Sequence, residues 1–185
     1  MTSNSGADAS IAGSLRVEDG KGAVRMEARL KAGSDEVWSA LTDPMRLVRW
    51  YGEVQGDLRV GGEYRAHLFA SGWEGTGRIE VCEAGRRLVV TGAEPGEPGT
   101  VTEVTLAADG GHTVLVWEER GMRVDGIGAY GAGVQIHVED LADHLAGRGR
   151  RDAEERWTEL WPVYDELATK IGLEALGTER GQRTG

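Results

Sequence analysis

The chain contains 185 residues and carries a formal net charge of −10, and this length is typical of about one domain. The acidic balance argues against a nucleic-acid or anionic-membrane surface, which needs clustered Lys and Arg to displace counterions. No apolar run approaches the roughly 20 residues of a membrane-spanning helix, so we expect no membrane span.

The N-terminal residues and the single cysteine bear on location. The segment MTSNSGADASIAGS lacks the basic start and apolar core of a secretory signal. Cys82 is the only cysteine, so an internal disulfide is impossible and a reducing, cytoplasmic location is predicted. The neighbours of Cys82 indicate a strand, and we expect its thiol to be buried and inert.

Composition divides the chain into three parts. Residues 1–14 are rich in Ser, Gly and Ala, and we expect a disordered lead because this segment has little to bury. A single domain is expected over residues 15–172, followed by a flexible tail over residues 173–185. At the start of the domain, Val24, Met26, Ala28 and Leu30 alternate with charged residues, as in a half-buried strand.

Two short helices are predicted next, between residues 34 and 51. Ser34 is a good capping residue for the start of the first helix. This helix should end before Pro44, because the residue preceding a proline avoids helical geometry while the proline itself suits the first turn of a second helix. Gly61 and Gly62 then predict a tight reversal between strands over residues 57–60 and 63–68.

The middle of the chain reads as a sheet. Further strands are expected near residues 63–70, 73–83, 87–92, 101–108 and 113–120, separated by turn-forming clusters such as EPGEPG. Short connections favour antiparallel pairing. Gly75 and Gly77 would share one face of a strand, which permits either a sharp bend or a close approach to the backbone, and we favour the bend.

Two helices are predicted after the sheet. Val134, Val138, Leu141 and Leu145 recur at helical spacing and form one apolar face. The glycine-rich residues 126–133 before them are interpreted as a flexible lid or a helix entry. A second amphipathic helix follows, in which Pro162 should cause a kink or a restart.

Several of these elements, in this order, resemble a known family. The residues EVWSALTDP (36–44), WYG (50–52) and DLRVGGEYR (57–65) are similar to motifs of the heat-shock protein 90 ATPase activator homologue family. That family belongs to the START and birch-allergen-like superfamily, also called SRPBCC. The resemblance covers roughly residues 22–172.

The resemblance implies an α+β helix-grip fold. In that fold a curved antiparallel sheet of about six to seven strands wraps around a long C-terminal helix, with two short helices after the first strand and, in this chain, an extra C-terminal helix. The space between sheet and long helix is a ligand cavity. The family usually carries a tryptophan at the position of Val134, so the smaller side chain would enlarge the cavity or move its mouth.

Aromatic residues can serve either the core or such a cavity. Trp38, Trp157 and Trp161 lie on amphipathic stripes and are expected in the core. Others flank the turns and strand ends where a cavity would open. The candidate lining or rim residues are Trp50, Tyr51, Tyr64, His67, Trp73, Trp117, Tyr130, Val134, His137 and Leu141.

Catalytic and metal-binding signatures are mostly absent from the sequence. There is no phosphate-binding loop, no paired CxxC motif, no nucleophile elbow and no dinucleotide fingerprint. His137, Asp140 and His144 would share one flank of a helix and could in principle bind zinc, but a solvated or cavity-rim face is the favoured interpretation. We therefore predict no metal, no cofactor and no assigned catalytic residue.

These features predict a protein that binds a small, largely apolar molecule without covalent chemistry. One alternative is a cyclase or dehydratase acting on an aromatic or polyketide-like substrate, with Tyr64, His67, Glu119 and His137 as candidate acids and bases. Another alternative, which the family name implies, is a protein that interacts with a chaperone or a regulator.

Overall fold

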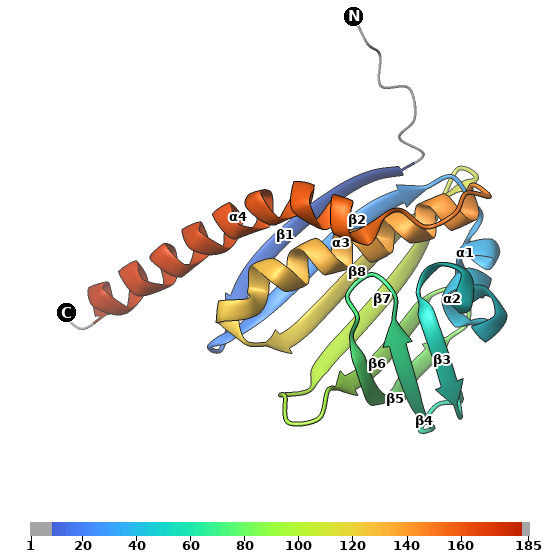
Figure 1. The fold of residues 1–185 in the computed structure, drawn as a ribbon, viewed down its shortest axis with the longest axis horizontal. Coiled ribbons are helices and arrows are strands. Elements are labelled where there is room, and N and C mark those ends of the chain that lie inside the picture. The colour runs from blue at the N-terminus through green and yellow to red at the C-terminus, as the bar shows by residue number, and fades with distance from the viewer. Residues whose placement is uncertain (1–8, 183–185) are drawn as a thin grey trace, which may run out of the picture.

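The computed structural model describes the backbone of residues 9–182 and the side chains of residues 10–172. The described strands form one eight-stranded antiparallel sheet in the order β1-β2-β8-β7-β6-β5-β4-β3 (Figure 1). Their bounds are Ala9–Glu18 for β1, Lys21–Leu30 for β2, Gly52–Gly56 for β3, Glu63–Leu68 for β4, Glu74–Glu83 for β5, Arg87–Ala93 for β6, Thr100–Asp109 for β7 and His112–Met122 for β8.

The helices occupy one side of the sheet and one of its ends. The short helices α1 (Ser34–Thr42) and α2 (Pro44–Trp50) follow β2, and a 3-10 turn, η1 (Val124–Gly126), follows β8. The long helix α3 (Ile127–Leu145) lies across the sheet, and α4 (Ala153–Gln182) packs on α3 and β1 and then extends beyond the sheet (Figure 1). The predicted α+β helix-grip class is confirmed. None of these described helices is long and apolar enough to cross a membrane.

The N-terminal edge of the sheet differs from the prediction. Residues 9–14, expected in a disordered lead, belong to β1, which pairs with β2 from Ala9 opposite Leu30 to Glu18 opposite Lys21; residues 1–8 lie outside the described part of the chain. Ile11 and Leu15 pack their side chains against the core. Because they stand among small residues, the sequence shows little of the apolar alternation that predicts a strand. The described sheet therefore has one strand more than the roughly seven predicted.

The segment after α2 also differs from the prediction. The strand expected at residues 57–60 lies at residues 52–56 as β3, and the residues that follow form the turn into β4. Asp57 Oδ1 accepts a hydrogen bond from the Arg59 amide at 3.2 Å, and Gly61 has a φ of 82°, which favours glycine. The Asp57 side-chain cap and the positive φ of Gly61 thus favour a turn over residues 57–62 rather than a strand.

The helix ends show which local signals decide their positions. Gly33, not Ser34, is the N-cap of α1, and its carbonyl accepts from the Glu36 and Val37 amides. The start of α2 agrees with the prediction, because Pro44 occupies its first turn and Asp43 caps it through the Met45 amide at 2.9 Å. Helix α4 continues through Pro162 to Gln182, so residues 173–182, expected in a flexible tail, are helical; residues 183–185 are not described.

The core lies between the sheet and α3. The alternating residues Val24, Met26, Ala28 and Leu30 of β2 are all buried, as predicted, and they face buried α3 residues such as Ile136. Trp38 packs against the edge of this core. The prediction for Trp161 was wrong, because its side chain is 39% exposed and stacks on Trp157 with ring centroids 5.8 Å apart.

A set of ion pairs fixes α4 to the outer side of α3. Glu139 on α3 is held by Arg156 of α4 through two contacts of 2.7 Å. Asp143, one turn later, contacts Arg151 of the connecting loop at 2.8 Å. Both carboxylate side chains are only 7% exposed, so each of these buried charges has a cationic partner. We call Glu139, Asp143, Arg151 and Arg156 the α3–α4 clamp.

Candidate functional site

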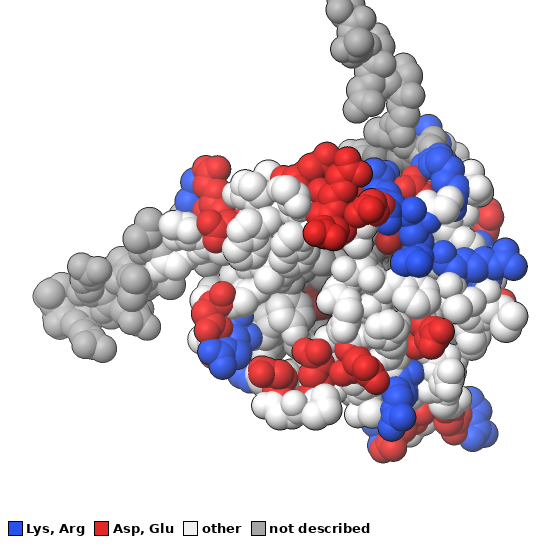
Figure 2. All heavy atoms as spheres, viewed as in Figure 1, with Lys and Arg blue, Asp and Glu red and all other residues white. Residues whose placement is uncertain are grey.

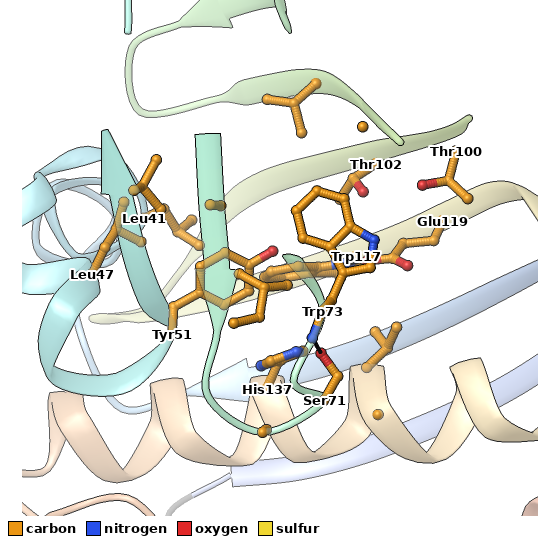
Figure 3. A pocket seen from close by; sticks show the side chains of 18 of the residues that line it. Leu41, Leu47, Tyr51, Ser71, Trp73, Thr100, Thr102, Trp117, Glu119 and His137 are labelled. Atoms are coloured by element: carbon orange, nitrogen blue, oxygen red, sulfur yellow. Dashed lines mark hydrogen bonds between the residues drawn. The ribbon is translucent and has the colours of Figure 1, made fainter. Parts of the chain in front are cut away.

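A cavity of about 680 Å³ lies between α3 and the concave face of the sheet. Strands β4 to β8 form its floor, the first half of α3 forms its roof, and α1 and α2 close one end (Figure 3). Most of the lining side chains are aliphatic or aromatic. The polar ones are Thr42, Tyr51, Tyr64, Ser71, Cys82, Glu94, Thr100, Thr102, Glu119, Tyr130, His137 and Glu154.

Most of the lining residues predicted from the sequence do line this cavity. The structure places Trp50, Tyr51, Tyr64, Trp73, Trp117, Tyr130, Val134 and His137 in its wall. Two others lie elsewhere: His67 is exposed, and Leu141 is fully buried in the core. Tyr64 and His67 are three residues apart in β4, and side chains alternate between the faces of a strand, so they point to opposite sides.

The wall also contains residues that the sequence analysis assigned elsewhere or left out. Trp157, expected in the core, borders the cavity, as do Thr100 and Thr102 of β7. Cys82, expected to be buried, is exposed. The stretch at residues 126–133, for which a lid was one interpretation, is mostly the start of α3, so the alternative of a helix entry is the one observed.

Glycines on the floor make room for two aromatic rings. A Cβ atom at Gly77 would lie 2.5 Å from the Tyr64 ring, and one at Gly75 would lie 2.6 Å from the Trp73 ring. Gly92, opposite Gly77 on the neighbouring strand, is in ordinary contact distance of both rings. A Cβ at Gly77 or Gly75 would lie even closer to the Thr91 and Ala93 carbonyls of β6, respectively, so both the neighbouring backbone and the aromatic rings approach these glycines closely, which is the second of the two roles considered for them. The Tyr64 hydroxyl is anchored by donating to the Thr91 carbonyl at 3.0 Å.

Glu119 is the charged residue of the inner floor. Along β8 the residues that face inward are Thr113, Leu115, Trp117 and then Glu119, and Thr102 is the cross-strand neighbour of Glu119. The Trp117 indole donates to Glu119 Oε1 at 3.1 Å, and Thr102 supplies a second hydrogen bond. Burial raises the pKa of the Glu119 carboxyl. A charged residue at an inward position of an apolar strand was the sequence signal for this site.

His137 enters the cavity from α3, on the roof side, and lies next to Tyr51 (Figure 3). Its side chain is 4% exposed, its Nδ1 atom has no hydrogen-bond partner among the described residues, and its ring makes an edge contact with the Tyr51 ring, with centroids 4.9 Å apart. Burial lowers the pKa of His137 to about 4, so the imidazole is neutral at pH 7. The cavity wall thus contains a neutral base on α3 and a carboxyl group on β8.

The three helix residues considered for zinc do not converge. Asp140 accepts from the Arg151 amide at 2.9 Å, and His144 Nε2 accepts from Arg46 Nε at 3.3 Å, while His137 faces the cavity. No group of three or more His, Cys, Asp or Glu side chains in the described residues could hold a metal ion.

The burial of His137 makes a testable contribution to acid sensitivity. The pKa of His137 in the folded protein, about 4, lies below the ordinary histidine value of 6.5, so the unfolded chain binds the proton more tightly and stability falls as the pH drops from 6.5 towards 4. Between pH 7 and pH 5, the wild type should lose about 2 kcal/mol more than His137→Gln in urea unfolding.

Comparing the wild type with His137→Gln separates the effect of His137 on the pH dependence of stability from the effects of groups that act in the opposite direction. Burial raises the pKa of Asp140 to about 6, and a raised carboxyl pKa favours the folded state as the pH falls, so the wild-type profile alone mixes two opposite slopes. His67→Gln, on the exposed outer face, is the matched control and should follow the wild type. If the free energy of unfolding depends on pH in the same way for the wild type and His137→Gln, protonation of His137 does not destabilise the folded state.

Comparison with known proteins finds solved structures that resemble this chain over most of its length. No curated protein matches the sequence. The crystal structure of CalU16 from Micromonospora echinospora has a TM-score of 0.71 and 26% identity, over 87% of this chain and 98% of that one. DynU16, a protein in the dynemicin biosynthetic locus, has a TM-score of 0.65 and 26% identity, over 74% of this chain and 51% of that one.

More distant structures share the fold alone. A conserved protein of unknown function from Enterococcus faecalis, EF2215, has a TM-score of 0.65 and 20% identity, over 86% of this chain and 91% of that one. The family described as activator of Hsp90 ATPase homolog 1-like protein matches residues 31–146, the part of the chain that contains α1, α2, the cavity floor and α3. The chain belongs to this family.

Proposed function

We propose that the protein binds one small, largely apolar molecule between the sheet and α3. The observation that carries the proposal is the cavity of about 680 Å³, a size typical of sites for drug-sized ligands. Its wall combines aromatic and aliphatic side chains with a few polar groups from different elements, including Glu119 of β8 and His137 of α3. This combination of apolar area and convergent polar groups is typical of ligand sites.

Two further facts support a ligand. In the described part of the chain His137 Nδ1 is buried without a hydrogen-bond partner, and such groups are rare because an unpaired buried polar atom is costly. One of the similar structures, DynU16, is described as a protein in the dynemicin biosynthetic locus. A setting in small-molecule biosynthesis is compatible with a binding role for this chain.

A thermal-shift screen over sterols, lipids, phenolics and aromatic polyketides tests the proposal. A ligand present at 100 times its Kd stabilises the fold by about 2.7 kcal/mol, which should raise Tm by roughly 5–10 °C for a domain of this size. Val134→Trp, which adds bulk to the roof, should keep the fold and reduce the shift. A well-folded wild type that responds to no compound, and from which native mass spectrometry releases no small molecule, would count against the proposal.

A second candidate function is proton-transfer catalysis of the cyclase or dehydratase kind. The observation that favours it is the pair of titratable groups on the floor and the roof, because burial raises the pKa of Glu119 and lowers that of His137. Such opposed shifts are typical of acid and base pairs in active sites. Turnover of a substrate that survives both Glu119→Gln and His137→Gln would exclude this role.

A further inference from the structure

The charged side chains that line the cavity, within the described part of the chain, have a single sign. Among the described residues the charged ones that line it are Glu94, Glu119 and Glu154; all three are acidic, and none of the described lining residues is Lys or Arg. On the face shown in Figure 2, acidic side chains flank the uncharged centre on two sides, while Lys and Arg side chains border it at the upper right. Like charges around a low-dielectric cleft raise the local concentration of opposite charges. The carboxyl groups of the cavity wall therefore favour a cation over an anion.

Glu119 is positioned to receive that cation. Its hydrogen bonds come from the Trp117 indole, at 3.1 Å, and from the Thr102 hydroxyl, which are neutral donors. No Lys or Arg of the described chain makes an ion pair with it, in contrast with Glu118 on the opposite face of β8, which contacts both Arg16 and Arg120. Glu119 is half-buried in the cavity wall, and a carboxylate in such an apolar setting normally has a cationic partner; on the cavity side of Glu119 that partner is missing from the described chain.

The walls beside Glu119 are suited to a cation as well. Trp117 and Tyr51 lie with ring centroids 5.8 Å apart, and Trp73 lines the same cavity (Figure 3). The faces of Trp and Tyr rings attract ammonium groups, most strongly where water is excluded. The Glu119 carboxylate and the faces of these rings together provide the kind of site that binds an amine removed from water.

We propose that the ligand of this cavity carries a protonated amine, which pairs with the Glu119 carboxylate while the apolar body lies against the aromatic walls. This inference rests on the proposed binding function and adds the charge of the ligand. It disfavours fatty acids and other carboxylates, since the cavity offers them no Lys or Arg and presents three carboxyl groups. Burial raises the pKa of the Glu119 carboxyl in the protein alone, and a cation bound beside it would lower that pKa again.

Three fluorescent probes that share one ring system test the charge directly. Anthracenylmethylamine is a cation at neutral pH, anthracenylmethanol is neutral and anthracenecarboxylate is an anion. The amine should bind about tenfold or more tightly than the alcohol, the effect of one charge-assisted hydrogen bond, and the carboxylate should bind most weakly. In Glu119→Gln the advantage of the amine over the alcohol should disappear, while binding of the alcohol is retained.

Glu118→Gln is the matched control, because it removes the same charge from the same strand on the outer face. It should leave the order of the three probes unchanged, and circular dichroism melts of both variants verify folding. Equal binding of amine and alcohol to the wild type would overturn the charge inference while supporting an apolar-ligand site. Preferential binding of the carboxylate would also overturn it. Failure of all three probes to bind the folded wild type would count against both proposals.

Discussion

Arg156→Ala should destabilise the protein by about 3 kcal/mol, a cost typical of removing one partner from a buried ion pair. Arg156 donates to both oxygens of Glu139 at 2.7 Å. The Glu139 side chain is only 7% exposed and that of Arg156 is 25% exposed. Without Arg156, Arg151 is the next cation, at 3.7 Å, and it already binds Asp143. The cost thus arises from a carboxylate that keeps its burial and loses its main partner.

Urea unfolding at neutral pH measures this cost, and two further variants test its origin. Arg123→Ala removes a pair with Asp125 in which both side chains are more than 60% exposed, and it should cost less than about 1 kcal/mol. The double variant Arg156→Met with Glu139→Leu removes both charges and should recover most of the stability. A double variant as unstable as Arg156→Ala would show that packing of the arginine stem, not the charge, is what matters.

Trp50→Ala should cost about 4 kcal/mol of stability, within the range observed for truncating a buried aromatic residue. Trp50 is 1% exposed and joins the core to the end of the cavity. Its indole donates to the Ala40 carbonyl at 3.0 Å. Ala40 lies in the last turn of α1, where carbonyls have no partner within the helix, so the substitution leaves both a void and an unpaired acceptor.

Thermal and urea unfolding of three variants separate these contributions. Trp50→Phe keeps most of the apolar volume and loses the hydrogen bond, so its cost should be intermediate. Trp161→Ala truncates a tryptophan that is 39% exposed and should change stability by less than about 1 kcal/mol. Similar costs for Trp50→Ala and Trp161→Ala would contradict the role given to Trp50.

The sequence predicts well those elements whose signals are local. Pro44 separates α1 from α2 through backbone geometry alone, and the alternation of Val24 to Leu30 predicts the buried face of β2. By contrast, β1 contains few large apolar residues, and its place depends on pairing with β2 and on contacts with α4. Gly13 illustrates this, because a Cβ there would lie 2.1 Å from the Tyr164 hydroxyl, a contact between segments far apart in the sequence.

The site follows the same division. Aromatic residues near turns predict much of the cavity wall. Tyr64 and His67 are three residues apart in one strand and therefore lie on opposite faces of the sheet, so the sequence itself indicates that only one of them can line the cavity. The environment of Glu119 could not be predicted, since it depends on the register that sets Thr102 of β7 opposite it. Likewise, Trp157 and Trp161 share one helical stripe, and only the placement of α4 decides that the first borders the cavity and the second faces solvent.

The glycines under Tyr64 and Trp73 have a consequence for how the cavity can adapt. These rings rest on main-chain atoms of β5, which are held in the sheet by hydrogen bonds on both sides and cannot change rotamer. The floor is therefore a rigid template with a fixed shape. The roof is built from side chains of helices, Val134 from α3 and Trp157 from α4, which can move without breaking a strand pair. Adjustment to ligands of different size thus belongs to the roof, and selection by shape belongs to the floor.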